Sequence, residues 1–397
     1  MTRISLDDLG LERVVPVTVV TGFLGSGKTT LLSRLLAHSD IKNTAVIVNE
    51  LGEVGLDHLL VQSPVDETIL LENGCICCTM RGDLSATLQE MVARCVSGEL
   101  PRLDRVVVET TGSADPVPLL QTLVEDVDVT NFYRFDGLVT VVDAFNGSQQ
   151  LDVHFQSIKQ AALADLVLFS KTDLVDGQVL DNLGSRIQRL NPGVKTGRVL
   201  NGEIDPQVIL GIASPSRDSL NDGVDAWLSE AAHEAVTRVN LVAHQCDVES
   251  ENDDHRHHNH NHNHNHDDAV NTFSVTRAGE IHPAALNLWL DLISVFQGPA
   301  LLRAKGILNI NGYPVLINVV QHVCHPPREL EVWPDDDRST RIVFITHNLD
   351  QQSLKSTLSA LDYMPSDSAP QELFTQDDYR QFTNILEQIK GASTVEA

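Results

Sequence analysis

The sequence lacks an apolar run of bilayer-spanning length. Its longest apolar stretches have the length of a strand, well below the roughly 20 residues that a membrane helix needs. Its first residues are acidic and lack the basic and then apolar pattern of a secretory signal. We therefore expect a cytoplasmic protein with no membrane partner.

Cysteines and basic residues are both scarce. Six cysteines in 397 residues, three of them crowded into residues 75–78, do not form the evenly spaced framework of a disulfide scaffold and predict reduced thiols. Lys and Arg number 28 against 55 Asp and Glu, which gives a net charge of −27. This charge repels a phosphate backbone and argues against a nucleic-acid partner. It attracts cations, although an acidic surface also simply aids solubility.

Short β-branched runs alternate with helical stretches over residues 14–235, the predicted first domain. The runs are apolar on both faces, as in a parallel sheet covered by helices. Strands are expected at 14–21, 45–49, 105–109, 137–143 and 165–170, and helices at 28–37, 84–97, 116–126, 156–164 and 178–191. The alternation predicts a doubly wound α/β domain with a mostly parallel sheet.

The composition changes abruptly after the first domain. Residues 247–268 contain almost nothing to bury and predict a disordered, His-rich linker. A smaller α+β domain is expected over residues 271–365. Its predicted strands are 272–276, 307–310, 315–320 and 342–346, and its helices 283–296 and 354–361. A further short helix is expected near 377–389.

A phosphate-loop motif, G-x-x-x-x-G-K-[ST], begins at Gly22 between a predicted strand and a predicted helix. Its glycines allow backbone N–H groups to turn around a phosphate, and the helix N-terminus adds a favourable dipole. Lys28 is expected to reach the β- and γ-phosphates in a catalytic role, and the Thr29 hydroxyl to bind Mg²⁺. The predicted nucleotide-binding residues of the loop are Gly22, Gly25, Ser26, Gly27, Lys28, Thr29 and Thr30.

An acidic residue ends the predicted strand 105–109. Glu109 is expected near the Mg²⁺ ion, holding it directly or through water and so taking part in catalysis. The amide of Gly112 follows closely enough to sense the γ-phosphate. The alternative is a strand that merely ends in a solvated glutamate.

Residues 170–173, Ser-Lys-Thr-Asp, come at the end of another apolar strand. They predict which base of the nucleotide the protein recognises. The carboxylate of Asp173 can accept the N1 and N2 hydrogens of guanine, while the Lys171 stem covers the ring. Adenine lacks that donor pair, so GTP is favoured over ATP. The usual first residue of such a turn is Asn, and Ser170 is expected to weaken the hydrogen bond that braces the loop.

Three cysteines, Cys75, Cys77 and Cys78, follow Gly74 and offer soft thiolate ligands for Zn²⁺ or Cu(I). Three neighbouring sulfurs do not easily complete a tetrahedral site, and no second cysteine pair follows. The pattern therefore indicates an open site that suits metal transfer. Inert buried cysteines and a redox pair are the alternatives.

This chain resembles the CobW-type metallochaperone GTPases, because its motifs occur in the order seen in that family. Besides the motifs above, the matching parts are the segments 48–58, 72–78 and 106–112, the His-rich linker and RAKG at 303–306. The resemblance spans about residues 14–360. It implies a P-loop GTPase domain, a CobW-like C-terminal domain and GTP-gated metal delivery to client metalloproteins. Zinc is the first expected metal and cobalt the second. It also places Asn49, Glu50 and Glu53 in a switch segment between nucleotide and metal, with Glu50 and Glu53 as further candidate metal ligands. The cysteine–proline docking motif of the eukaryotic zinc-transfer members is not found here.

Other clusters have weaker interpretations. Alternating histidines in the linker predict loose, exchangeable metal binding, against the alternative of a plain spacer; they are His255, His257, His258, His260, His262, His264 and His266. His322, Cys324 and His325 are a cramped candidate set of ligands, with a plain strand end as the alternative. Arg277, Arg303 and Lys305 are candidates for the second domain's contact with nucleotide or client, or else solvated charges.

The sequence thus predicts a GTPase in which Mg·GTP orders the segment 48–58 and alters the thiolate site. The alternatives are a metal buffer or sensor that holds nucleotide as a regulatory ligand, and a small-molecule kinase. No lid motif supports the kinase. No arginine finger or water-positioning glutamine is evident, so slow turnover is expected. The client and a homo-oligomeric state are left open.

Overall fold

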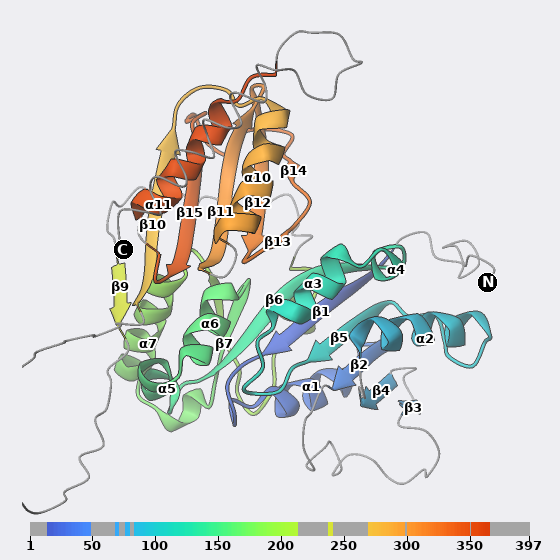
Figure 1. Cartoon of the computed structure of the whole chain (residues 1–397). Helices are drawn as coiled ribbons and strands as arrows, with labels where there is room; N and C mark the ends of the chain where they lie inside the picture. Colours follow the sequence, from blue (N-terminus) through green and yellow to red (C-terminus); the bar gives the residue numbers. More distant parts are fainter. Residues whose placement is uncertain are drawn as a thin grey trace, which may run out of the picture.

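The computed structural model describes residues 14–48, 68–70, 76–79, 83–212, 237–240, 269–297, 300–349 and 351–365. The chain forms two domains, each built from one sheet and its helices. The second domain packs against helices of the first domain (Figure 1). The predicted fold class, a doubly wound P-loop domain followed by a smaller α+β domain, is confirmed. Among the described residues no helix is both long and apolar enough to cross a membrane.

The first sheet has eight strands in the order β3-β4-β2-β5-β1-β6-β7-β8. Every neighbouring pair is parallel except β3–β4. The strands are β1 (Val15–Thr21), β2 (Thr44–Val48), β3 (Thr68–Leu70), β4 (Ile76–Thr79), β5 (Arg105–Glu109), β6 (Tyr133–Asp143), β7 (Leu166–Ser170) and β8 (Lys195–Arg198). Strand order reverses around β1, and ligands of such sheets bind at the carboxyl ends of the strands beside this point.

Helices cover both faces of this sheet because its strands are apolar on both sides. One face packs against α2 (Leu84–Val96), α3 (Val117–Glu125), α6 (Phe155–Leu163) and α7 (Gly177–Leu190). The other packs against α1 (Lys28–Leu36) and α8 (Pro206–Ile209). The connections also contain α4 (Val127–Thr130), α5 (Gly147–Val153) and the 3-10 turn η2 (Thr172–Leu174).

The second domain is an antiparallel sheet of seven strands, with Trp289 and Phe344 at the centre of its core. Its strands are β9 (Thr237–Asn240), β10 (Ala269–Arg277), β11 (Leu301–Ile310), β12 (Tyr313–Val320), β13 (Val323–Cys324), β14 (Arg328–Glu329) and β15 (Thr340–His347). Its helices are α10 (Pro283–Gln297), α11 (Gln351–Thr357) and the 3-10 helix η3 (Leu358–Asp362). Because β9 pairs with β10, this sheet includes a strand that precedes the His-rich segment.

The two domains share a continuous apolar contact. Side chains of the second sheet, among them Val270, Leu302 and Ile345, belong to the same buried cluster as the helices of the first domain. Strands β10 and β11 contact α7 and α6, respectively (Figure 1). Helix α6 therefore lies between the first sheet and the second domain.

Several elements extend beyond the prediction or were missed by it. Strand β6 begins at Tyr133 and β11 at Leu301, each several residues before the expected start. Strand β8 was not expected because its residues are largely exposed and polar. The expected helix at 377–389 lies outside the described residues.

Candidate functional site

The predicted phosphate loop forms a tight turn between β1 and α1. Gly22, Gly25 and Gly27 all have positive φ angles, of 144°, 72° and 93°, which side chains disfavour. A Cβ atom at Gly22 would lie 2.2 Å from the carbonyl oxygen of Val141. The backbone conformation therefore favours glycine at all three positions, and close packing also requires it at position 22. Helix α1 begins at Lys28, so its first N–H groups face the loop, as phosphate binding requires.

The two predicted catalytic side chains lie at this loop. The Lys28 ammonium is buried and donates to the carbonyl oxygens of Gly22 at 2.8 Å and of Phe23 at 3.4 Å. Glu109 ends strand β5 and is only 2% exposed. The Thr29 hydroxyl donates a hydrogen bond to Glu109 Oε1 at 2.9 Å. A hydroxyl and a carboxylate are the hard oxygen ligands that Mg²⁺ prefers, so these two residues fit the ion.

The loop that follows β5, residues 110–115, packs directly against the phosphate loop. A Cβ atom at Gly112 would lie 2.6 Å from the backbone nitrogen of Leu24, so only glycine allows this approach. The Thr110 hydroxyl donates to Thr21 Oγ1 at 2.7 Å. Gly112, the predicted γ-phosphate sensor, is thus brought to the loop that would hold the phosphates.

The predicted guanine turn lies beside the same loop. The Ser170 hydroxyl donates to the carbonyl oxygen of Ser26 at 2.6 Å, so this residue braces the phosphate loop although it replaces the usual Asn. Lys171 has a φ of 53° and its ammonium lies 2.8 Å from Asp143 Oδ2. Asp173 is exposed in the turn η2. This arrangement leaves the Asp173 carboxylate accessible to a base.

Asp143 supports this turn, and sequence reasoning missed it. Its side chain also accepts from the backbone N–H groups of Phe145 at 2.9 Å and Asn146 at 3.2 Å. Burial raises the pKa of Asp143, but the hydrogen bonds from Lys171, Asn146 and Phe145 outweigh burial and lower it. An ionised Asp143 therefore fixes Lys171. Its place at the carboxyl end of β6, next to the end of β7, was the available signal.

Part of the thiolate motif lies in the sheet. Cys77 and Cys78 belong to strand β4, which the sequence did not predict, whereas Cys75 lies outside the described residues. Strand β4 pairs in parallel with β2, and β2 pairs in parallel with β5. Cys78 is opposite Ile47, and Ile47 is opposite Val108, the residue before Glu109. The motif and Glu109 thus lie at nearly the same level of one sheet.

Several predicted metal-binding residues fall outside the described part of the chain. They are Glu50 and Glu53, with Asn49 of the proposed switch segment, and the linker histidines 255–266. Within the described ranges, no three His, Cys, Asp or Glu side chains are grouped to hold a metal ion.

His322, Cys324 and His325 do not form a metal cluster within the described structure. Cys324 lies 3.0 Å from the Ser294 hydroxyl, and burial raises the pKa of its thiol. The ring of His325 instead packs at a tilt of 32° against Phe135 of β6, with the ring centroids 5.1 Å apart, in the contact between the domains. Burial lowers the pKa of His325 to about 4, and the charges of Asp165, Arg303 and Lys305 act on it.

His325 gives the domain contact a predicted pH dependence. An unfolded histidine binds a proton near pH 6.5, whereas His325 in the folded protein binds one only near pH 4. Between these values the unfolded chain binds more protons, so the free energy of unfolding should fall by on the order of 2 kcal/mol as the pH drops. Chemical denaturation at pH 7 and pH 4.5 measures this fall, and His325→Gln should reduce it. An equal fall in both proteins would contradict the assignment to His325.

Comparison with known proteins identifies the family. The CobW/HypB/UreG nucleotide-binding domain profile matches residues 16–197, and the cobalamin synthesis protein CobW C-terminal domain profile matches residues 270–362. The chain is 30% identical over 350 residues to the zinc chaperone YjiA of Escherichia coli (strain K12), covering 87% of this chain and 98% of that protein. The chain belongs to the CobW/HypB/UreG family.

Two further comparisons agree with this membership. The chain is 28% identical over 383 residues to the zinc chaperone CobW of Sinorhizobium sp., covering 87% of this chain and 97% of that protein. The crystal structure of the Zn(II)-bound YjiA GTPase from E. coli matches with a TM-score of 0.63 and 26% identity, over 88% of this chain and 99% of that chain. The predicted CobW-type family and GTPase class are thereby confirmed.

Proposed function

We propose that this CobW/HypB/UreG-family protein is a GTP-dependent metallochaperone. It binds a thiophilic metal at Cys75, Cys77 and Cys78; zinc is the leading candidate for this metal and cobalt the next. The protein passes the metal to a client metalloprotein, and this transfer is coupled to GTP hydrolysis. The zinc-chaperone names of the relatives and the Zn(II)-bound YjiA structure support zinc as the cargo. The observation that carries the proposal is the pairing of β4, β2 and β5.

This pairing connects the thiolate strand to the nucleotide site through one intervening strand. Val48 at the end of β2 is opposite Thr79 on one side and Glu109 on the other. Neighbouring strands lie about 4.8 Å apart, so the backbones of Cys78 and Glu109 are separated by about 10 Å. A change at the γ-phosphate can therefore reach the metal site through β2 and the switch segment that follows it, proposed to include Glu50 and Glu53.

The chemistry at the nucleotide follows from the residues already described. We assign the phosphates to the backbone N–H groups of the phosphate loop and to Lys28, which offsets the charge that develops as water attacks the γ-phosphorus and the bond to the GDP oxygen breaks. Thr29 and Glu109 would hold Mg²⁺, and the bound ion would neutralise phosphate charge. Asp173 and Lys171 select guanine. Gly112 reports the presence of the γ-phosphate.

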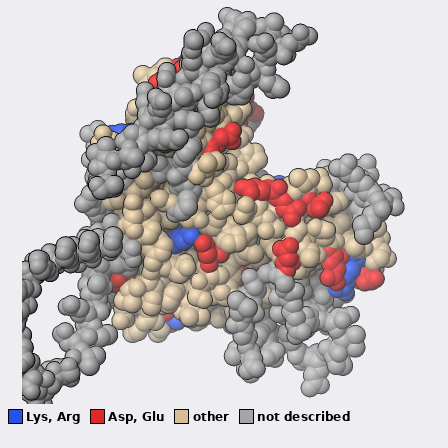
Figure 2. Space-filling view, viewed as in Figure 1, with Lys and Arg blue, Asp and Glu red and all other residues tan. Residues whose placement is uncertain are grey.

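The surroundings of the site also favour metal ions. Acidic side chains form several separate patches on the face in Figure 2, in keeping with a net charge of −27, and these patches favour the approach of cations. The linker histidines are proposed to collect metal loosely. We place the protein and its client in the cytoplasm.

Zinc-dependent GTP hydrolysis tests the proposal. The metal-free protein is compared with and without one equivalent of Zn²⁺, beside the variant Cys75→Ser/Cys77→Ser/Cys78→Ser, which keeps the histidines. We expect zinc to change the hydrolysis rate and the triple variant to lose this response. Zinc should also change the affinity for GTP by about 5- to 150-fold, the range of ordinary coupling between two sites, and because the coupling of binding equilibria is reciprocal, GTP should change the affinity for zinc by the same factor.

A matched control uses the half-buried cysteines elsewhere in the chain. Cys95→Ser/Cys324→Ser should keep the zinc response, because neither residue lies in the thiolate strand. Equal slow hydrolysis in all conditions would overturn metal-coupled delivery. It would support a metal buffer in which nucleotide is only a regulatory ligand.

A further inference from the structure

Helix α6 holds the loop 110–115 beside the nucleotide site. The Gln160 side-chain amide is 1% exposed and donates to the carbonyl oxygens of Gly112 at 3.2 Å and Ala114 at 3.1 Å. Lys159, one residue earlier, forms an ion pair with Asp115 at 2.6 Å. Two consecutive residues of one helix thus fix the backbone of the loop at Gly112 and Ala114 and the side chain of Asp115.

The beginning of α6 also contacts the phosphate loop. The ring of His154, which immediately precedes the helix, stacks on Phe23 with centroids 4.5 Å apart and planes 22° apart. Phe155, the first helical residue, packs on His347 of β15 at 4.1 Å. This end of α6 therefore contacts both the nucleotide site and the second domain.

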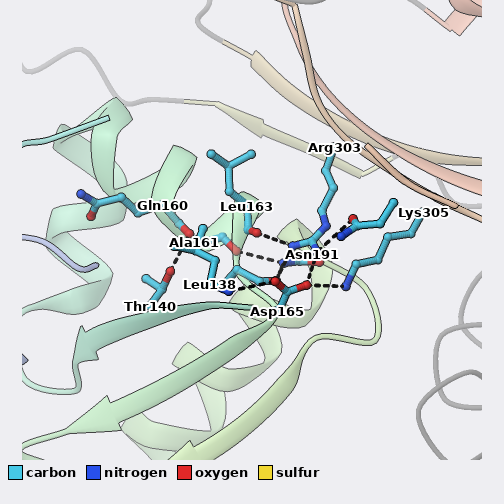
Figure 3. Close-up of polar contacts among 11 residues, drawn as sticks. Leu138, Thr140, Gln160, Ala161, Leu163, Asp165, Asn191, Arg303 and Lys305 are labelled. Carbon is cyan, nitrogen blue, oxygen red and sulfur yellow. Dashed lines mark hydrogen bonds and ion pairs between the residues drawn. The ribbon is translucent and has the colours of Figure 1, made fainter. Parts of the chain in front are cut away.

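The C-terminus of α6 is held by an arginine of the second domain. Arg303 of β11 is 1% exposed, although its charge would ordinarily favour solvent. Its guanidinium donates to the carbonyl oxygens of Leu163 and Ala164 and forms an ion pair with Asp165, the residue that follows (Figure 3). Lys305 lies 3.5 Å from the same carboxylate.

These contacts satisfy the carbonyl groups that a helix leaves unpaired at its end. Thr140 donates to Gln160 O, and Asn191 donates to Ala161 O and Ala164 O (Figure 3). A cation at this position also interacts favourably with the helix dipole. The second domain thus supplies a charged cap for α6.

The cap and the loop contact lie on a single helical turn. Gln160 and Leu163, whose carbonyl oxygen Arg303 caps, are three residues apart in α6 and so lie within one turn, which backbone hydrogen bonds keep stiff. A shift of the helix end caused by a change at Arg303 therefore moves Gln160 and the loop that it holds.

We propose that Arg303 is a positioning residue for the nucleotide site and acts through Gln160 of α6. The second domain thereby sets how well the loop 110–115 distinguishes GTP from GDP. By reciprocity, the bound nucleotide biases the position of the second domain. This inference rests on the proposed GTPase function for its turnover measurement, but its affinity measurement needs only nucleotide binding.

Two variants test the link. Arg303→Lys keeps the charge but cannot donate to two carbonyls and a carboxylate with the fork geometry of a guanidinium. Gln160→Met keeps the length of the side chain and removes both hydrogen bonds to the loop. We measure kcat and KM for GTP hydrolysis and the affinities for fluorescent GTP and GDP analogues. Each variant should lose about 5-fold or more of the GTP-over-GDP preference, within the usual range of site coupling. It should lower kcat more than it raises KM.

The matched control is Arg341→Lys. Arg341 is also a largely buried arginine, is 12% exposed by side chain, and pairs with Asp335 within the second domain. This variant should resemble the wild type in both measurements, while thermal unfolding reports any general loss of stability. The double variant Arg303→Lys/Gln160→Met should lose little more than either single variant, because both changes interrupt the same link.

The outcomes separate this inference from the proposed function. An unchanged GTP-over-GDP preference in folded Arg303→Lys, or losses that multiply in the double variant, would overturn the role of Arg303. An altered preference alongside a wild type that hydrolyses no GTP would support the link and overturn the proposed GTPase cycle.

Discussion

Replacing Lys28 by alanine is expected to lower the rate of GTP hydrolysis by about 100- to 1,000-fold, the cost of removing one well-placed donor from developing negative charge. The Lys28 ammonium is buried beneath the phosphate loop, where its 2.8 Å contact with Gly22 O keeps it close to the bend of the loop. Charge in such a low-dielectric place acts strongly on a phosphate. Single-turnover hydrolysis at saturating GTP measures the loss in the chemical step itself.

Lys42→Ala is a suitable control, because this lysine is exposed and follows helix α1. It should keep wild-type hydrolysis. Circular dichroism and thermal unfolding should show that Lys28→Ala remains folded. Hydrolysis within a few-fold of the wild type in folded Lys28→Ala would exclude the phosphate loop as the catalytic centre.

The phosphate loop could be predicted from sequence because all its requirements are local. Glycine spacing, a lysine and a threonine between a strand and a helix specify the turn without any distant partner. The contact between Thr29 and Glu109 was also predictable, although 80 positions separate them. Thr29 lies shortly after strand β1, and Glu109 ends the neighbouring strand β5. The carboxyl ends of neighbouring parallel strands meet at one edge of the sheet.

The supporting residues could not be predicted, because their roles depend on tertiary partners. Gln160 lies in a largely buried helix where an amide has no local sequence signal, and only the fold places it against residues 112–114. Arg303 was expected either to contact nucleotide or client or to be solvated. It is buried against α6 instead, because β11 crosses the end of that helix.

The departure at Ser170 shows how a local rule can mislead. A serine is shorter than the usual asparagine, and a weaker brace was expected. Its hydroxyl nevertheless reaches Ser26 O at 2.6 Å, because the end of strand β7 lies close to the backbone of the phosphate loop. Backbone proximity thus replaces side-chain length.

Asp173→Asn is expected to lower affinity for GTP by about 10- to 1,000-fold. A carboxylate accepts both the N1 and N2 hydrogens of guanine, and each hydrogen bond to a charged group contributes about 1.5–3 kcal/mol. Asparagine places an N–H donor against one of these hydrogens. Xanthine carries a carbonyl where guanine carries the amino group, so the variant should gain affinity for xanthosine triphosphate. Competition of each nucleotide against a fluorescent GTP analogue measures the affinity lost for GTP and the affinity gained for xanthosine triphosphate.

The Asp173 prediction depends on a turn that is fixed before the base binds. Asp143 holds Lys171 at 2.8 Å, and Lys171 occupies a left-handed conformation immediately before η2. Asp176→Asn is the matched control, because Asp176 is a nearby exposed carboxylate that caps α7 through Val179 N, and asparagine caps a helix equally well. That variant should bind GTP like the wild type. Undiminished GTP affinity in Asp173→Asn would mean that the base is recognised elsewhere, whereas a loss shared by ATP would indicate a collapsed turn.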